Sequence, residues 1–282
     1  MNLRLVIFVL GLLLLFSGVA MLWPLAFSLY FGDGDHSAFT AAIGINLLAG
    51  GALLAFGRGR QRTELSHREG FAIVTLGWLS LALFGSLPYL FAGVLSHPVD
   101  AVFETMSGYT TTGATVLTQI EGQPRGLLFW RSLTHWFGGM GVLVLVTAIL
   151  PFLGVGGMQL IRAEAPGPVT DRLTPRIAST AKVLWVVYLG LSLAETMLLM
   201  VGGMSLYESL CHTFATMATG GFSTRDASIA AFGSVYIECV IILFMFLAGT
   251  RFSLHYRFLT ELDWRKFWQD EEFRFYAAVL VG

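Results

Sequence analysis

Long apolar runs dominate the chain, and each has about the length of a helix that crosses a lipid bilayer. Such a helix needs about 20 mostly apolar residues, because roughly 30 Å of hydrocarbon is spanned at about 1.5 Å per residue. The qualifying runs are Leu5–Phe31, Phe39–Phe56, Phe71–Val94, Leu127–Leu153, Val183–Val201 and Ile229–Ala248, and another begins near Phe273. The pattern predicts an all-α polytopic membrane protein.

Basic residues are concentrated in alternate loops between these runs. Fourteen of the seventeen Lys and Arg residues fall on one side, and the exceptions are Arg125, Arg131 and Arg225. The first loop on the opposite side carries Asp33 and Asp35. Because bases near membrane spans are enriched in cytoplasmic loops, we expect a cytoplasmic N-terminus.

The overall composition agrees with a membrane protein. Of the 282 residues 55% are hydrophobic and 12% are charged, with a net charge of −1, whereas soluble domains carry about 25% charged residues. A nearly neutral chain lacks the basic excess that neutralises phosphates, so we expect no nucleic-acid partner. The lipid bilayer is the expected surrounding.

The 32 residues from Leu95 to Gly126 are too apolar for a plain loop and too short for two further crossings. Ser96-His97-Pro98 resembles a helix start, with Ser96 as its cap. The pattern predicts a short re-entrant helix over 100–107, followed by an extended segment over 108–115 that is rich in Thr and Gly. Irregular backbone survives at membrane depth only where protein or a water-filled cavity satisfies it, so this segment is expected to line a pore.

The same arrangement recurs between the fifth and sixth runs, where a short helix is expected over 206–217 and an extended segment over 218–224. A shift of 108 residues aligns Thr105 with Thr213, Thr111 with Thr219, Gly113 with Gly221, and Thr115 with Ser223. The chain therefore contains an internal repeat. Backbone carbonyls of such a loop can replace the hydration shell of a cation, and the C-terminal end of a short helix adds partial negative charge.

Several motifs resemble the Trk/Ktr/HKT superfamily of potassium transporters, and its bacterial TrkH branch most closely. They are Thr110–Thr115, Phe129–Gly141, Leu150–Leu160, Arg162–Pro168, Ala218–Thr224 and Leu254–Tyr256. The resemblance covers nearly the whole chain and implies potassium as the substrate, a location in the cell inner membrane, and a pore of four repeats behind two additional helices. It also implies a homodimer on a cytoplasmic ring of nucleotide-binding TrkA-type subunits.

The repeat and the resemblance together give a domain layout. Residues 1–62 are expected to form the two additional helices, 63–165 the first pore repeat (helix, pore helix, filter, helix), 166–262 the second, and 263–282 the start of a third. Two filters cannot close a fourfold ring. We therefore expect either a longer protein whose front half this is, with the third and fourth repeats following, or the pairing of two such halves.

The expected ion-binding positions are Thr110, Thr111, Thr112, Gly113 and Ala114 in the first filter, and Ala218, Thr219, Gly220, Gly221 and Phe222 in the second. Carbonyls coordinate the ion in such filters, so potassium is expected at the backbone of Thr111, Thr112, Gly113, Thr219, Gly220 and Gly221. Charges at membrane depth are costly unless they are paired or near water. We expect Glu104 and Arg131 to be structural, with each other as candidate partners. The alternative is that Arg131 tunes the outer field for cations.

Other interpretations remain open. Gly113 and Gly221 are also compatible with close helix packing. A polytopic membrane enzyme would use Glu195, Glu238 or His135 as its acid or base, and a non-conducting assembly subunit would explain the spans alone. These candidate acids and bases are dispersed, with no nucleophile beside them. The sequence therefore favours a transporter that is not an enzyme and has no covalent cofactor.

Overall fold

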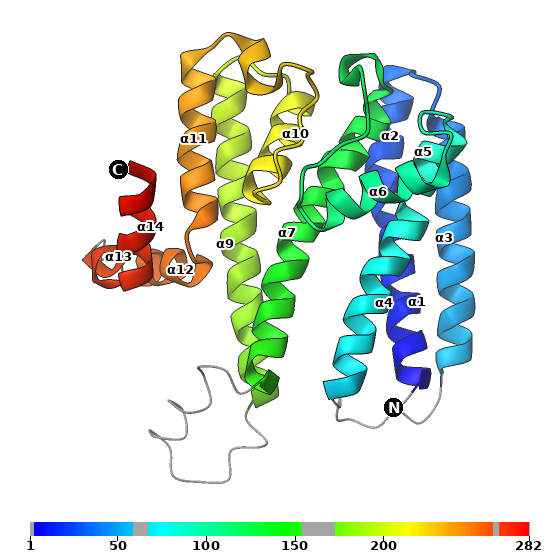
Figure 1. Ribbon diagram of the computed structural model, residues 1–282, viewed down its shortest axis with the longest axis horizontal. Coiled ribbons are helices and arrows are strands. Elements are labelled where there is room, and N and C mark those ends of the chain that lie inside the picture. Colours follow the sequence, from blue (N-terminus) through cyan, green and yellow to red (C-terminus); the bar gives the residue numbers. More distant parts are fainter. Residues whose placement is uncertain (1–2, 59–66, 154–172, 262–264, 282) are drawn as a thin grey trace. The chain divides into compact units, whose positions relative to one another are not determined.

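The computed structural model describes residues 3–58, 67–153, 173–261 and 265–281, and the regular secondary structure of these residues is helical (Figure 1). They form two compact units. The first contains Met1–Gly138 and Gly220–Ala231, and the second contains Gly139–Thr219 and Phe232–Gly282. The predicted all-α class is confirmed.

The first unit begins with a helical hairpin. Its elements are α1 (Leu3–Ala20), α2 (Leu22–Phe31) and α3 (His36–Gly57), so the first apolar run is interrupted at Met21 instead of forming one uninterrupted helix. Helices α1 and α3 lie side by side (Figure 1). A Cβ atom added at Gly11 or Gly50 would lie 2.9 Å from the carbonyl oxygen of the other glycine. Glycine therefore allows the two backbones to approach closely.

The third apolar run is also divided. It forms α4 (His67–Gly85) and α5 (Leu87–Phe91), with a break at Ser86. Pro88 lies at the start of α5, where a missing backbone N–H is tolerated. The indole Nε1 of Trp130 donates a hydrogen bond of 2.9 Å to the Gly85 carbonyl at the end of α4.

The first short helix, α6 (Pro98–Tyr109), extends beyond the predicted range of 100–107 at both ends. The expected cap was wrong, because His97 occupies the N-cap position and Ser96 precedes it. Pro98 is the first helical residue, as its fixed φ favours. A short 3₁₀ turn, η1 (Ile120–Gly122), follows the loop, and α7 (Arg125–Leu153) begins after it.

The second unit contains α9 (Leu173–Val201) and the second short helix, α10 (Leu206–Met217). The bounds of α10 match the prediction. The sixth apolar run was expected to begin at Ile229, but a 3₁₀ turn, η3 (Ser228–Phe232), occupies its first residues. Helix α11 (Val235–Gly249) starts only after Ser234, whose hydroxyl caps it. The chain then continues through α12 (Phe252–Glu261), α13 (Arg265–Gln269) and α14 (Glu271–Val281).

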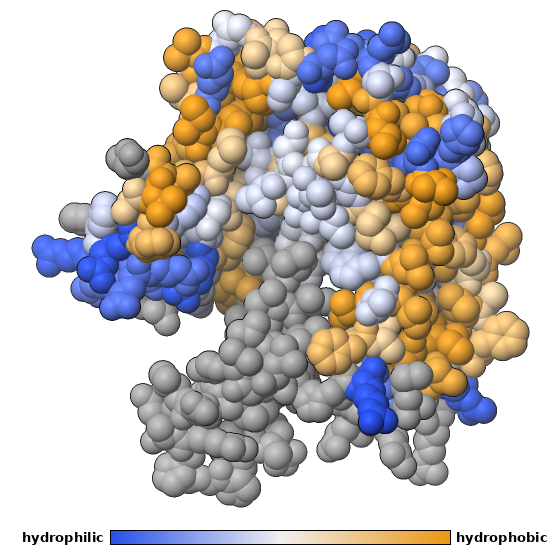
Figure 2. Space-filling view, in the orientation of Figure 1, coloured by the Kyte–Doolittle hydropathy of each residue, from blue (hydrophilic) through white to orange (hydrophobic). Residues whose placement is uncertain are grey.

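Within the described residues, four helical stretches are long and apolar enough to cross a membrane: Leu3–Phe31, His36–Gly57, Arg68–Phe91 and Val183–Val201. Val235–Gly249 is a shorter apolar helix. Large apolar side chains such as Leu48 and Phe56 on α3 are exposed. Figure 2 shows hydrophobic side chains over the helices of the first unit, with hydrophilic ones toward their ends. This surface suits a hydrocarbon surrounding.

Some of the sequence predictions fall outside the described residues. They concern most of the motif Leu150–Leu160, all of Arg162–Pro168, and the loop bases Arg60, Arg62, Arg162 and Arg172.

The two short helices differ in their caps, and this difference gives a first testable prediction. The Ser205 hydroxyl accepts a hydrogen bond of 3.2 Å from the Glu208 backbone amide, whereas Ser96 is exposed and lies before the cap of α6. Loss of a capping hydroxyl costs about 0.5–2 kcal/mol. We expect Ser205→Ala to lower the thermal unfolding temperature of the detergent-purified full-length protein and Ser96→Ala to leave it unchanged. Equal effects of the two substitutions would contradict this account of the caps.

Candidate functional site

The two predicted pore loops follow helices of the same length at a constant offset. Helices α6 and α10 each contain 12 residues, and both their first and last residues are separated by the 108 positions found in the sequence repeat. The loops after them, over 112–117 and 220–223, are neither helix nor strand. The internal repeat therefore extends to the local structure.

Each short helix is followed, two residues after its last residue, by a threonine with left-handed backbone geometry. Thr111 has a φ of 54° and Thr219 a φ of 55°. At α6 the Thr111 amide donates to the Gly108 carbonyl at 3.0 Å, and the Thr112 amide donates to the Ser107 carbonyl at 3.0 Å. This pair of bonds is the Schellman arrangement that usually has glycine at the left-handed position.

A β-branched residue in this region is a genuine outlier. Such a conformation costs on the order of 1–3 kcal/mol and persists only where the surrounding structure imposes it. The second loop repeats it, and there the Thr219 amide donates to the Thr216 carbonyl at 2.9 Å. Two such outliers at equivalent positions favour a functional requirement for this backbone path. Sequence reasoning placed the conformational freedom at the glycines alone and missed the threonines.

The glycines of the two predicted filters add a second left-handed residue to each loop. Gly113 has a φ of 75° and Gly221 a φ of 88°. A Cβ at Gly113 would collide with the carbonyl oxygen of Gly220, whereas a Cβ at Gly221 would have no heavy atom within 4 Å. Gly113 is therefore required both for its backbone conformation and for a close approach of the two loops.

A side-chain turn is repeated as well. The hydroxyl of Thr115 accepts a hydrogen bond of 3.1 Å from the amide of Leu117. At the equivalent position, the hydroxyl of Ser223 accepts one of 3.0 Å from the amide of Arg225. Hydroxyl residues favour such turns because they offer an acceptor two residues before a backbone donor. Both loops therefore contain the same hydroxyl-to-amide turn.

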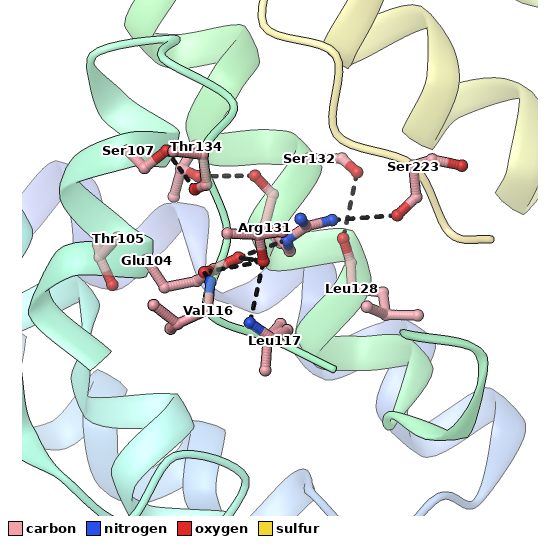
Figure 3. Close-up of polar contacts among 12 residues, drawn as sticks. Glu104, Thr105, Ser107, Val116, Leu117, Leu128, Arg131, Ser132, Thr134 and Ser223 are labelled. Carbon is pink, nitrogen blue, oxygen red and sulfur yellow. Dashed lines mark hydrogen bonds and ion pairs between the residues drawn. The ribbon is translucent and has the colours of Figure 1, made fainter. Parts of the chain in front are cut away.

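Glu104 on α6 and Arg131 on α7 form a buried ion pair, the pairing expected from the sequence (Figure 3). Arg131 Nε lies 2.7 Å from Glu104 Oε1, and the two side chains are 2% and 0% exposed. The carboxylate also accepts hydrogen bonds from the Thr115 hydroxyl, at 2.9 and 3.0 Å, and from the Val116 amide, at 2.9 Å. Glu104 thereby fixes the residues that follow the first predicted filter.

Arg131 also contacts the second loop. Its Nη1 donates a hydrogen bond of 3.0 Å to the carbonyl oxygen of Ser223 (Figure 3). The guanidinium carbon lies 3.5 Å from the centre of the Phe222 ring, a cation–π contact. Arg131 therefore contacts residues at the ends of both predicted filter segments, and Ser223 lies 92 positions after it in the chain.

The hydroxyl groups of the first loop are engaged locally. Thr110 Oγ1 donates to the Met106 carbonyl at 2.8 Å and lies 2.8 Å from Thr112 Oγ1. The Ala114 carbonyl accepts a bond of 2.6 Å from the Ser107 hydroxyl. These contacts leave the backbone carbonyls of Thr111, Thr112 and Gly113 as the main candidates for binding an ion in this loop.

The second loop is exposed at Thr219 and Gly221. Ala218 and Phe222 are buried, and the Phe222 ring contacts Arg131 and His135. The side chain of Phe222 thus serves packing.

The candidate acids and bases of the enzyme interpretation lie on different helices. Glu195 is buried on α9, His135 is buried on α7, and Glu238 is exposed in the first turn of α11. Among the described residues there is no group of three or more His, Cys, Asp or Glu side chains placed to hold a metal ion.

Comparisons with known proteins agree on one family. The TrkH family model, described as a cation transport protein, matches residues 35–280. The chain is 46% identical over its whole length to the Trk system potassium uptake protein TrkH of Halomonas elongata, and covers 59% of that protein. It is 44% identical to the protein of the same name from Escherichia coli K12, over 99% of this chain and 58% of that one.

A solved structure gives the same result. The crystal structure of the potassium transporter TrkH from Vibrio parahaemolyticus aligns with a TM-score of 0.89 and 38% identity, over 100% of this chain and 57% of that chain. The chain thus spans just under three fifths of the length of these relatives.

The matching family consists of transport proteins and not of enzymes, which confirms that expectation. The helices that can cross a membrane, the family model and the matched relatives lead to one conclusion: the chain is a multi-pass membrane protein that belongs to the TrkH family of cation transport proteins.

Proposed function

We propose that the chain forms part of a potassium uptake pathway in which the backbone of the two loops binds the ion. The observation that carries the proposal is the repeated left-handed pattern, Thr111 with Gly113 and Thr219 with Gly221, directly after two helices of equal length. The names of the matched relatives support potassium as the ion.

The backbone pattern has a physical rationale for binding a cation. In a regular strand, successive residues alternate in direction. Left-handed residues interrupt this alternation, so that neighbouring carbonyl oxygens can face the same side. Carbonyls arranged in this way replace the water shell of the ion. The partial negative charge at the C-terminal ends of α6 and α10 favours cations over anions.

The membrane potential sets the direction of transport through the proposed pore. We place the N-terminus in the cytoplasm because the bases gather on that side of the spans, and the protein in the cell inner membrane. The membrane potential contributes about 2.3 kcal/mol per charge per 100 mV. A potassium ion therefore enters a negative cell through such a pore without covalent chemistry.

We propose the following domain layout, in which both filters belong to pore repeats. Residues 1–62 form the additional helix pair, 63–165 the first repeat, 166–262 the second, and 263–282 the beginning of a third. A fourfold ring requires two further filters. The proposed partners are a second copy of the protein and a cytoplasmic ring of TrkA-type nucleotide-binding subunits.

The test is potassium-limited growth and rubidium uptake in a bacterium that lacks its own potassium uptake systems and expresses the complete reading frame. We expect the parent to restore growth and Gly221→Asp to abolish uptake, because the substitution strains the second loop and adds a charge beside the ion. Gly203→Asp is the matched control, since Gly203 has a φ of 95°, is equally free of neighbours, and lies between α9 and α10.

Immunoblots of the membrane fraction verify that all three proteins are present in equal amounts. A parent that restores neither growth nor uptake would contradict the proposed function. Uptake by Gly221→Asp at the level of the parent would contradict the assignment of the second loop.

A further inference from the structure

His135 lies behind the second loop and has no assigned role in ion binding. It is on α7, one helical turn after Arg131, and its side chain is fully buried. Its ring stacks on Phe222, with centroids 3.9 Å apart and an angle of 16° between the planes. Neither ring nitrogen has a hydrogen-bond partner within the part of the chain that the structure describes.

The imidazole also lies in close contact with Gly220. A Cβ added at Gly220 would lie 2.5 Å from Nδ1 and 2.7 Å from Nε2. The ring edge that carries both nitrogens therefore faces this glycine. Gly220 is not among the residues with positive φ, so its backbone conformation is compatible with an L side chain. A side chain at this position is excluded by the imidazole of His135 and not by the backbone conformation.

This contact joins different repeats. Helix α7 belongs to the first proposed repeat, but His135 and Arg131 together touch Gly220, Phe222 and Ser223 of the second loop. The same 108-residue offset places Cys239 and Leu243 at the corresponding positions of α11, and both are exposed. The Thr and Gly pattern of the filter is thus repeated in the sequence, but the residues equivalent to Arg131 and His135 are not buried in the second repeat.

We infer that His135 is a positioning residue that sets the ion preference of the second loop by fixing the backbone of Gly220. The inference rests on the proposed function. Backbone carbonyls of a filter replace the hydration shell of the ion, so a shift of the Gly220 backbone changes how well the second loop replaces that shell for one ion relative to another. The buried aromatic ring provides a rigid support because it is held between α7 and the ring of Phe222.

The test compares His135→Ala, Gly220→Ala and the double variant in the complete protein, by rubidium uptake in the presence of increasing sodium. We expect His135→Ala to reduce the preference for rubidium over sodium by about tenfold, which corresponds to about 1.4 kcal/mol of differential binding. Gly220→Ala alone should lose most uptake, because its methyl group meets the imidazole. The double variant should recover uptake, since the space is then free.

Ser132→Ala is the control, because Ser132 is buried on the same helix and its hydroxyl bonds to the Leu128 carbonyl of that helix. It should retain the selectivity of the parent. If His135→Ala lowers the maximal uptake rate but keeps the parent's ion preference, or if the double variant is no better than Gly220→Ala, the inference is overturned. A parent without rubidium uptake would instead contradict the proposed function.

If His135→Ala does not reach the membrane, Gly220→Ala tests the same contact from the loop side. Its residual uptake should show the same reduced preference for rubidium, and an unchanged preference would overturn the inference.

Discussion

Replacing Gly113 with alanine is expected to abolish rubidium uptake by the complete protein. The substitution places a Cβ on a residue with a φ of 75° and drives it into the carbonyl oxygen of Gly220. The backbone conformation alone costs an L-residue about 1–3 kcal/mol. The collision adds to this cost and displaces both loops at once. Uptake should fall to the level of cells without the transporter.

Gly93→Ala is the matched control for this substitution. Gly93 has a φ of 69°, close to that of Gly113, but a Cβ there meets no heavy atom within 4 Å, and the residue precedes α6 instead of following it. Uptake should remain close to that of the parent. Equal losses in the two variants, at equal amounts in the membrane, would show that backbone strain anywhere in this region is sufficient and that the contact between the loops is not needed.

Replacing Arg131 with methionine should produce the second large effect. The substitution leaves the Glu104 carboxylate buried without its counter-charge and removes the hydrogen bond to the Ser223 carbonyl. Breaking a buried ion pair from one side costs about 3–5 kcal/mol. We expect a marked fall in the thermal unfolding temperature of the detergent-purified full-length protein, together with a loss of uptake.

The double variant Glu104→Gln/Arg131→Met separates charge from packing. A neutral pair of similar volume is often no less stable than the buried ions it replaces, so the unfolding temperature should largely recover. Uptake should stay low, because the hydrogen bond from Arg131 to the Ser223 carbonyl is absent. Glu121→Gln is the surface control, since the Glu121–Arg225 pair is 3.9 Å long and both side chains are at least 40% exposed. Exposed pairs contribute about 0–1 kcal/mol. A single variant Arg131→Met as stable as Glu121→Gln would contradict the proposed role of the buried pair.

Much of the fold follows from local sequence patterns. Apolar runs of spanning length predicted the helices, and the capping serine before 206–217 allowed α10 to form over the range expected. The repeat was visible because Thr and Gly recur at a fixed spacing. The apolar pattern alone does not show the interruptions at Met21 and Ser86, but Pro24 and Pro88 follow them, and each removes a backbone donor from the helix.

The details of the site depend on contacts that no local pattern encodes. Threonine normally favours extended backbone, so nothing in the sequence around Thr111 or Thr219 indicates a left-handed residue. The link from Arg131 to Ser223 joins residues 92 positions apart. A charge at membrane depth suggests that a partner exists, but only the tertiary structure identifies the second loop as one of the partners.

The central claim is that the backbone of the two loops binds the transported ion. The most direct measurement is a difference density map of the full-length protein prepared in thallium and in sodium, since thallium is an electron-rich substitute for potassium. Our account predicts a thallium peak beside the carbonyl oxygens of Gly113 and Gly221. Thallium density at a buried acid such as Glu195, with none along the two loops, would contradict it.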